Sequence, residues 1–110
     1  MQRALSELER RILIRMCPTV ATAAFLRSCQ VASLNVDDSI VDFHLADASL
    51  LGENIVELAH GIFKSSKGDV CGFALLLGDE KGFPRQLDLH GINDGLTVGD
   101  LAALEFFVLD

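Results

Sequence analysis

The stretch from Asn54 to Gly91 constrains the fold more than any other part of this chain. Apolar residues alternate there with polar or small ones, which is the period of β-strands that bury one face. Two polar, glycine-containing segments, Ser65–Gly68 and Gly78–Pro84, interrupt the alternation, as turns do. The stretch is therefore predicted to form three antiparallel strands at the middle of a sheet.

These two turns also predict which residues face one another. A turn at Ser65–Gly68 places His60 opposite Phe73, and a turn at Gly78–Pro84 places Leu75 opposite Leu87. This register gathers the large apolar side chains on one face, which is predicted to be the core face and to receive the helices. The predicted core face comprises Val56, Leu58, Ile62, Phe73, Leu75, Leu77, Leu87 and Leu89.

The opposite face of the predicted sheet carries small residues with an acidic margin. It is interpreted either as the solvent side of a two-layer fold or as a flat surface that another protein approaches closely. Its small residues include Ala59, Gly61, Gly72 and Ala74.

The N-terminal third is predicted to be helical. Ser6 and Glu9 have the spacing of a capping box, and apolar residues recur at helical intervals from Ser6 to Met16. Pro18 ends this helix and suits the first turn of a second one, which is predicted to end near Cys29. The arginines on the polar side of the first helix are interpreted as a solvent-exposed face; the alternative interpretation is a basic patch that docks a partner. They are Arg10, Arg11 and Arg15.

A further hairpin is predicted between the helices and the central stretch. From Val31 to Leu45 the period is again that of a strand, and Asp37-Asp38 suits a two-residue turn that pairs Leu34 with Val41. After Gly91, residues 100–104 are predicted to form a helical turn or two, and residues 105–109 to be extended. The predicted fold class is α+β: two N-terminal helices on one face of a roughly five-stranded antiparallel sheet, a hairpin plus a three-stranded meander.

Length and composition are those of one globular domain spanning residues 1–110. Half of the 110 residues are hydrophobic and about a quarter are charged, and the apolar runs are too short for a membrane helix. The N-terminus carries charges where a signal peptide needs an apolar segment. Three cysteines without paired spacing, Cys17, Cys29 and Cys71, suit reduced thiols. A cytoplasmic location is therefore predicted.

The net charge of −7 is unevenly distributed. Residues 1–27 hold five arginines against two glutamates, a net +3, whereas the remainder holds four basic against fourteen acidic residues, a net −10. No Lys or Arg lies between Arg27 and Lys64. Such a surface repels phosphate backbones and attracts basic proteins, so a protein partner is expected and direct nucleic-acid binding is not.

The candidate chemistry of the chain is sparse. His44, His60 and His90 lack the short paired spacing of metal sites, and the predicted register separates them, with His60 in the core. Asp88 and His90 lie two residues apart on one strand face, but no nucleophile is predicted beside them. No cofactor, no metal and no enzymatic activity are expected; a small enzyme that uses Asp88 and His90 would need a pocket beside them.

The order of elements resembles two groups of proteins. A capped N-terminal helix, a short second helix, a hairpin and a meander ending in QLDLHG are similar to a family of small bacterial domains and to the acidic immunity proteins of contact-dependent growth inhibition and related toxin systems. The resemblance implies a protein that binds a toxin domain, usually a basic nuclease, and covers its active site. The carboxylates and one aromatic residue predicted to bind that partner are Asp37, Asp38, Asp42, Asp79, Glu80, Phe83 and Asp88.

A different role stays open alongside this one. The chain is alternatively a structural or regulatory module that forms a homo-oligomer through its exposed sheet face. The chain is expected to be a monomer or a weak homodimer.

Overall fold

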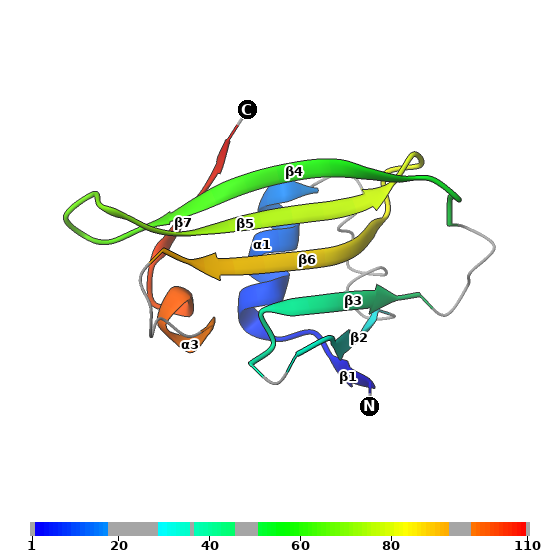
Figure 1. Cartoon of the computed structure of the whole chain (residues 1–110), viewed down its shortest axis with the longest axis horizontal. Coiled ribbons are helices and arrows are strands. Elements are labelled where there is room, and N and C mark those ends of the chain that lie inside the picture. The colour runs from blue at the N-terminus through cyan, green and yellow to red at the C-terminus, as the bar shows by residue number, and fades with distance from the viewer. Residues whose placement is uncertain (1, 18–28, 36, 46–50, 93–97, 110) are drawn as a thin grey trace.

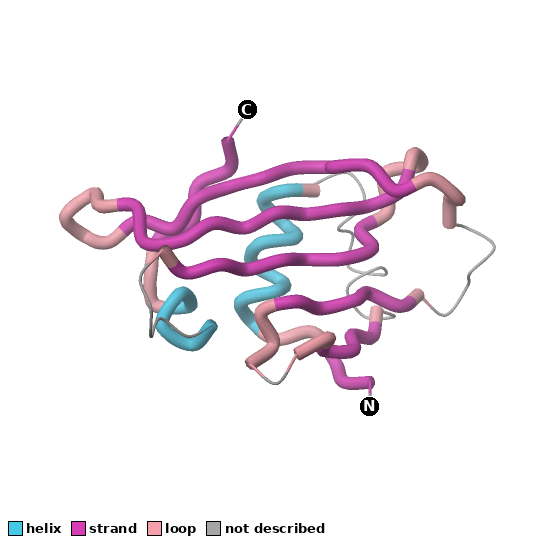
Figure 2. The backbone as a smooth tube through the Cα atoms, viewed as in Figure 1, coloured by secondary structure: helices cyan, strands magenta, loops and turns pink. Residues whose placement is uncertain are grey.

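The computed structural model describes residues 2–17, 29–35, 37–45, 51–92 and 98–109. In this part of the chain, seven antiparallel strands form one sheet in the order β1-β2-β3-β6-β5-β4-β7 (Figure 1, Figure 2). Helix α1 lies across one side of the sheet, called the inner face below; the other side is the outer face. The elements are β1 (Gln2–Ala4), α1 (Glu7–Met16), β2 (Gln30–Ser33), β3 (Ile40–His44), β4 (Ile55–Lys64), β5 (Val70–Asp79), β6 (Pro84–Gly91), α3 (Val98–Ala102) and β7 (Glu105–Leu109).

This architecture corrects the predicted fold class. The sheet has seven strands where about five were predicted, and α1 is the one long helix of the described part, with α3 as a short second helix near the C-terminus. The predicted helix after Pro18 lies outside the described residues. Strand β1 was missed because three residues are too few to show a period. The extended tail was predicted correctly, since residues 105–109 form β7.

Helix α1 begins at the predicted capping box. Ser6 Oγ accepts a hydrogen bond from the Glu9 N–H at 3.2 Å, and Glu9 Oε1 accepts one from the Ser6 N–H at 2.9 Å. The buried Glu9 carboxylate also accepts two hydrogen bonds from the Arg3 guanidinium, at 2.8 and 2.6 Å, so the charge of Glu9 is paired. This contact ties β1 to the helix. The buried apolar side of α1 comprises Leu8, Ile12, Leu13 and Met16.

The core lies between α1 and the inner face, and glycines in the strands make room for it. A Cβ on Gly61 would lie 2.4 Å from Phe106 Cζ, and one on Gly72 would lie 2.7 Å from Leu101 Cδ2. Large side chains therefore pack directly on the sheet backbone at these positions. The rings of Phe63 and Phe106 meet with their centroids 5.0 Å apart. Further core residues from the strands are Val31, Val41, Phe43, Ala74, Leu76, Leu87 and Leu89.

The predicted core face of the meander is confirmed for Leu87 and Leu89, which are buried, but is wrong for β5, where Phe73 is exposed. A bulge explains why the two strands differ. Gly78 pairs with Pro84 as the predicted turn requires, but the register then shifts and Leu77 pairs with Gln86. The extra residue, Arg85, moves the remainder of β6 by one position and so exchanges its two faces relative to β5. Leu87 consequently lies opposite the buried Leu76.

The β4-β5 hairpin turns where it was predicted to turn, but its register differs. Ser65 and Gly68 close the turn through a 2.9 Å hydrogen bond from the Gly68 N–H to the Ser65 carbonyl, and Gly68 has a φ of 87°, which glycine adopts without strain. A register shift next to Lys64 then places Ile62 opposite Phe73. His60, predicted in the core, lies on the outer face with 45% of its side chain exposed.

The β2-β3 hairpin shows a similar slip. The predicted two-residue turn is a longer loop, closed by a 2.7 Å hydrogen bond from the Leu34 N–H to the Ile40 carbonyl. Val31 pairs with Phe43 in place of the predicted Ala32, so Val31 is fully buried and Leu34 is exposed.

No helix in the described ranges is long and apolar enough to span a membrane.

Candidate functional surface

The outer face carries an apolar band across β5, β4 and β7. Phe73 is 48% exposed, Phe107 37% and Leu109 39%, while the other members are half-buried. Ile62 pairs with both Phe73 and Phe107, which makes the band continuous across the three strands. Contiguous exposed apolar side chains of this kind mark interaction surfaces. The band, called the outer apolar band below, comprises Ile62, Phe73, Leu75, Leu77, Phe107 and Leu109.

Two carboxylates border this band on the side of β3 and β6. Asp88 lies opposite Leu75, and Asp42 lies opposite Gln86 on the neighbouring strand. Asp88 Oδ1 accepts a hydrogen bond from Gln86 Nε2 at 2.8 Å, whereas Asp42 has no hydrogen bond or ion pair to any residue that the structure describes. Asp42 and Asp88 are called the acidic margin below. Two of the predicted partner-binding residues therefore lie together, beside an apolar surface.

A hollow of about 220 Å³ opens between the acidic margin and the end of the apolar band. Arg85 lies in its wall, but the guanidinium donates a 3.2 Å hydrogen bond to the Gly52 carbonyl and lies 3.6 Å from Asp79 Oδ2. Since Arg85 is paired in this way, Asp42 is the carboxylate in the wall of the hollow whose charge no described residue compensates. The lining residues are Asp42, Phe43, His44, Ile55, Leu77, Arg85 and Gln86.

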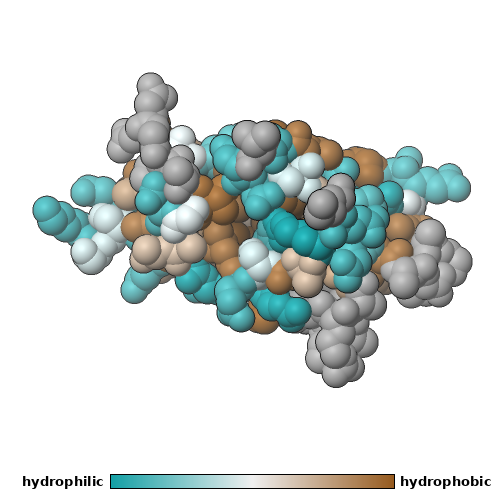
Figure 3. All heavy atoms as spheres, turned by 90° about the horizontal axis from the view of Figure 1, so that it is seen from below, coloured by the Kyte–Doolittle hydropathy of each residue, from teal (hydrophilic) through white to brown (hydrophobic). Residues whose placement is uncertain are grey.

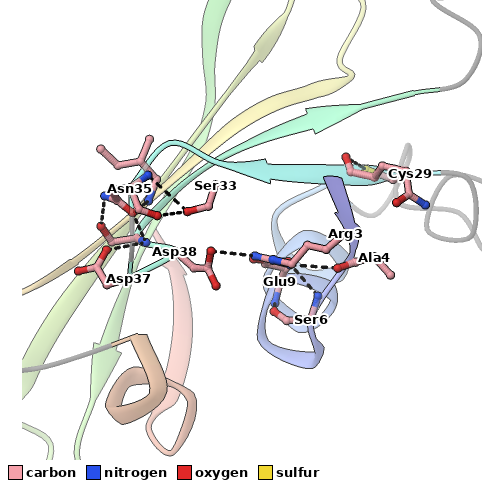
Figure 4. A network of polar contacts seen from close by, with 12 residues as sticks. Arg3, Ala4, Ser6, Glu9, Cys29, Ser33, Asn35, Asp37 and Asp38 are labelled. Carbon is pink, nitrogen blue, oxygen red and sulfur yellow. Dashed lines mark hydrogen bonds and ion pairs between the residues drawn. The ribbon is translucent and has the colours of Figure 1, made fainter. Parts of the chain in front are cut away.

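Asp37 and Asp38 lie in the β2-β3 loop, on the side of the inner face: Asp37 lines a hollow with Leu101 of α3, and Asp38 lies beside Arg3. Asp37 is exposed, and its Oδ1 accepts a hydrogen bond from the Ser39 N–H at 3.2 Å. Hydrogen bonds from Ser39 hold the pKa of Asp37 below its usual range. Asp38 has a φ of 59° and lies 3.7 Å from Arg3 Nη2. Figure 4 shows the Arg3 guanidinium between Asp38 and Glu9, so Asp38 is partly neutralised.

Asp79 and Glu80, also predicted to bind the partner, stabilise a loop. Asp79 is fully buried, and it accepts hydrogen bonds from the N–H groups of Gly52, Lys81 and Phe83 at 2.9 to 3.1 Å. Glu80 accepts from the N–H groups of the two residues after Gly52, at 3.0 and 2.8 Å. Asp79 therefore cannot contact a partner. Phe83, predicted to be exposed, is half-buried and packs against the core.

These hydrogen bonds also set the acidity of the two carboxyl groups. Burial opposes ionisation of Asp79, but the backbone N–H groups and Arg85 outweigh it, so the pKa of Asp79 lies below its usual range. Backbone N–H groups, including those of Asn54 and Glu53, likewise lower the pKa of Glu80. Both carboxylates are charged at neutral pH and hold the segment before β4 against the β5-β6 turn.

The residues considered for catalysis do not assemble into a site in the described part of the chain. Burial raises the pKa of Cys17 and of Cys29 to about 11, so both thiols are protonated at neutral pH. A hollow of about 200 Å³ includes His90, Asp37 and Ser39, but Asp88 is not in its wall. No group of three His, Cys, Asp or Glu side chains among the described residues is placed to hold a metal ion.

The sequence reasoning missed the apolar band as a surface. It assigned Ile62, Phe73 and Leu75 to the core, and it assigned the small residues of the same strands to an exposed face. The glycines contained the missing signal, because a glycine inside a strand marks the close approach of another group and so indicates the packed side.

Seen from the side of β1, hydrophilic side chains are interspersed with smaller hydrophobic areas (Figure 3).

Comparison with known proteins supplies no relative for this chain: no family model, no curated protein and no solved structure matches it.

Proposed function

We propose that this chain is a non-catalytic binding module whose outer apolar band and acidic margin hold a basic protein, and that this partner is a toxin domain which the chain neutralises. The observation that carries the proposal is the exposure of the apolar band next to a carboxylate, Asp42, that has no partner among the described residues. Apolar area supplies affinity, and the carboxylates select a positively charged partner.

The chemistry of a nuclease suits this surface. A nuclease must attract phosphates, so the rim of its active site is basic, and an inhibitor with clustered carboxylates gains association rate and complementarity there. The partner-binding carboxylates of the proposal are Asp42 and Asp88. Asp37 and Asp38, which were predicted to have the same role, lie on the side of the inner face. The immunity role itself rests on the resemblance described above. A cytoplasmic location belongs to the same proposal.

The test is an interaction assay between the purified chain and the protein encoded by the gene directly upstream. We expect association that weakens as salt rises, because exposed charges are screened. Asp42→Asn with Asp88→Asn should weaken binding, and Phe73→Glu should abolish it. Asp69→Asn is the matched control, since Asp69 is an exposed carboxylate in the β4-β5 turn, away from the margin.

Two results would count against the proposal. Absence of any association with the upstream gene product would remove the toxin as partner. Binding that Phe73→Glu leaves unchanged would remove the outer face as the binding surface.

A second candidate function is homo-oligomerisation through the same outer apolar band, favoured by the exposure of Phe73 and Phe107. The small residues first considered for such an interface are on the covered inner face, where Gly61, Gly72 and Ala74 are buried. Light scattering after size exclusion separates the candidates, because a monomer at micromolar concentration contradicts this one.

A further inference from the structure

Strand β7 forms one edge of the sheet. Its residues pair with β4 on one side, and no described strand lies on the other side. An edge strand offers N–H and C=O groups to a further strand, and natural proteins often protect such edges with Lys or Pro. The sequence of β7, Glu105–Leu109, contains neither. Among the described residues, no strand pairs with this edge, so its outward N–H and C=O groups can pair with an added strand.

A hollow of about 370 Å³ runs between α1 and this edge. Two arginines of α1 lie in its wall together with residues of β7. Arg11 donates hydrogen bonds to the carbonyls of Ala102 and Leu104 at 3.3 and 3.4 Å, both long. Arg15 is exposed and has no hydrogen bond or ion pair to a described residue. The complete lining is Arg11, Arg15, Leu104, Glu105, Phe106 and Phe107.

We propose that the free edge of β7 is a docking site for an extended acidic peptide segment, which adds an eighth strand and places carboxylates in the hollow against Arg15 and Arg11. Alternate side chains of an added strand point to the inner side of the sheet, where α1 and its arginines lie. Strand addition supplies affinity through main-chain hydrogen bonds, and pockets for alternate side chains supply specificity. Guanidinium groups bind carboxylates in a bidentate geometry.

Charge decides which occupant fits. Arg11 and Arg15 are the two basic residues in the wall of the hollow, and Glu105 is the one acidic residue there. A basic segment would meet two like charges there. A second copy of this chain would bring its own Arg11 and Arg15 to the shared edge, where the four guanidinium groups would repel one another. An acidic segment is the complementary partner.

This site differs from the one in the proposed function. The basic partner occupies the outer face, whereas the acidic segment occupies the β7 edge and the inner side beside α1. Both sites include Phe107, so Phe73→Glu on the outer face and Arg15→Glu beside α1 are the variants that separate them. Loss of either interaction therefore leaves the other testable.

The experiment uses the full chain and a fluorescein-labelled octapeptide of alternating glutamate and valine, with binding followed by anisotropy. We expect the peptide to bind and the amide resonances of β7 to shift in NMR spectra. Arg15→Glu should weaken binding about tenfold, the loss expected for a charge-assisted contact. Lys67→Glu, the same charge change at the exposed β4-β5 turn, should leave binding within about twofold.

Control peptides separate the two parts of the proposal. An alternating lysine and valine octapeptide should not bind, and neither should the acidic peptide with methylated backbone nitrogens, which cannot complete the strand pairing. Equal binding of the lysine peptide, equal binding of the methylated peptide, or an equal effect of Lys67→Glu and Arg15→Glu would each overturn the proposal. A dimer whose formation shifts the β7 amide resonances, and which the acidic peptide does not dissociate, would assign the edge to a second copy and would also overturn the proposal.

Discussion

The two faces of the sheet use the same strands for opposite purposes. The inner face combines small residues, such as Gly61 and Ala74, with large buried ones, such as Phe63, and α1 and α3 lie against it. The outer face also has large apolar side chains, including Phe73 and Phe107, but these are exposed. Side-chain size alone therefore does not identify the core face; room for a helix or an aromatic ring does, and glycine makes that room.

Neighbouring leucines on β5 provide the largest test of this comparison. Leu76 is fully buried on the inner face, and Leu75 is half-buried on the outer face. We expect Leu76→Ala to reduce the free energy of unfolding by about 3 kcal/mol, through lost transfer energy and a cavity. Leu75→Ala should cost about 1 kcal/mol. Urea denaturation measures both, and a larger cost at Leu75 would contradict the observed register.

The next test fills the space that a glycine leaves. Gly61→Ala places a methyl group 2.4 Å from Phe106 Cζ and 2.6 Å from the Phe107 carbonyl oxygen, so the ring and the β7 backbone must both move. We expect a loss of about 2 to 3 kcal/mol, at the upper end for an overpacked core. Thermal unfolding of the variant measures the loss. A neutral or stabilising effect would show that β7 is not packed over Gly61.

The pH dependence of stability distinguishes the buried carboxylate of Asp79 from the carboxylates of the outer face. The pKa of Asp79 is lowered in the folded protein, so Asp79 contributes stability above its unfolded pKa and loses it as the pH falls through the folded value. Asp79→Asn should cost about 2 kcal/mol at pH 7. The cost should shrink between about pH 5 and about pH 2, because the wild type is protonated there too. Urea midpoints at pH 7, 4 and 3 provide the measurement, and a cost independent of pH would contradict the assignment.

The smallest expected effect on stability is at the acidic margin. Asp42→Asn should change the free energy of unfolding by less than about 0.5 kcal/mol, because Asp42 is on the surface and has no partner among the described residues. The same variant should weaken binding of the basic partner. A stability loss similar to that of Asp79→Asn would mean that Asp42 has a structural role.

Local signals in the sequence predicted local structure well. The capping box at Ser6 and Glu9 set the start of α1, because both of its hydrogen bonds form within one helical turn. The turns at Ser65–Gly68 and Gly78–Pro84 were also placed correctly. Each of these features depends on a few neighbouring residues.

The faces of the strands were not predictable in the same way. They depend on the strand register, which the bulge at Arg85 and the length of the β2-β3 loop each shift by one residue. A shift of one residue exchanges the two sides of a strand. The roles of the carboxylates depended on long-range contacts as well. Asp79 and Glu80 look like surface turn residues in the sequence, but they bind the backbone of residues 52–54, far away in the chain.

The most direct test of the face assignment is the exposure of the leucine methyl groups in the intact protein. Methyl relaxation is measured by NMR in the presence of a soluble gadolinium chelate, which acts on groups near solvent. We predict strong enhancement at Leu75 and Leu77 and weak enhancement at Leu76, Leu87 and Leu89. Protection of Leu75 and Leu77 together with Leu87 and Leu89, with Leu76 exposed, would contradict the account.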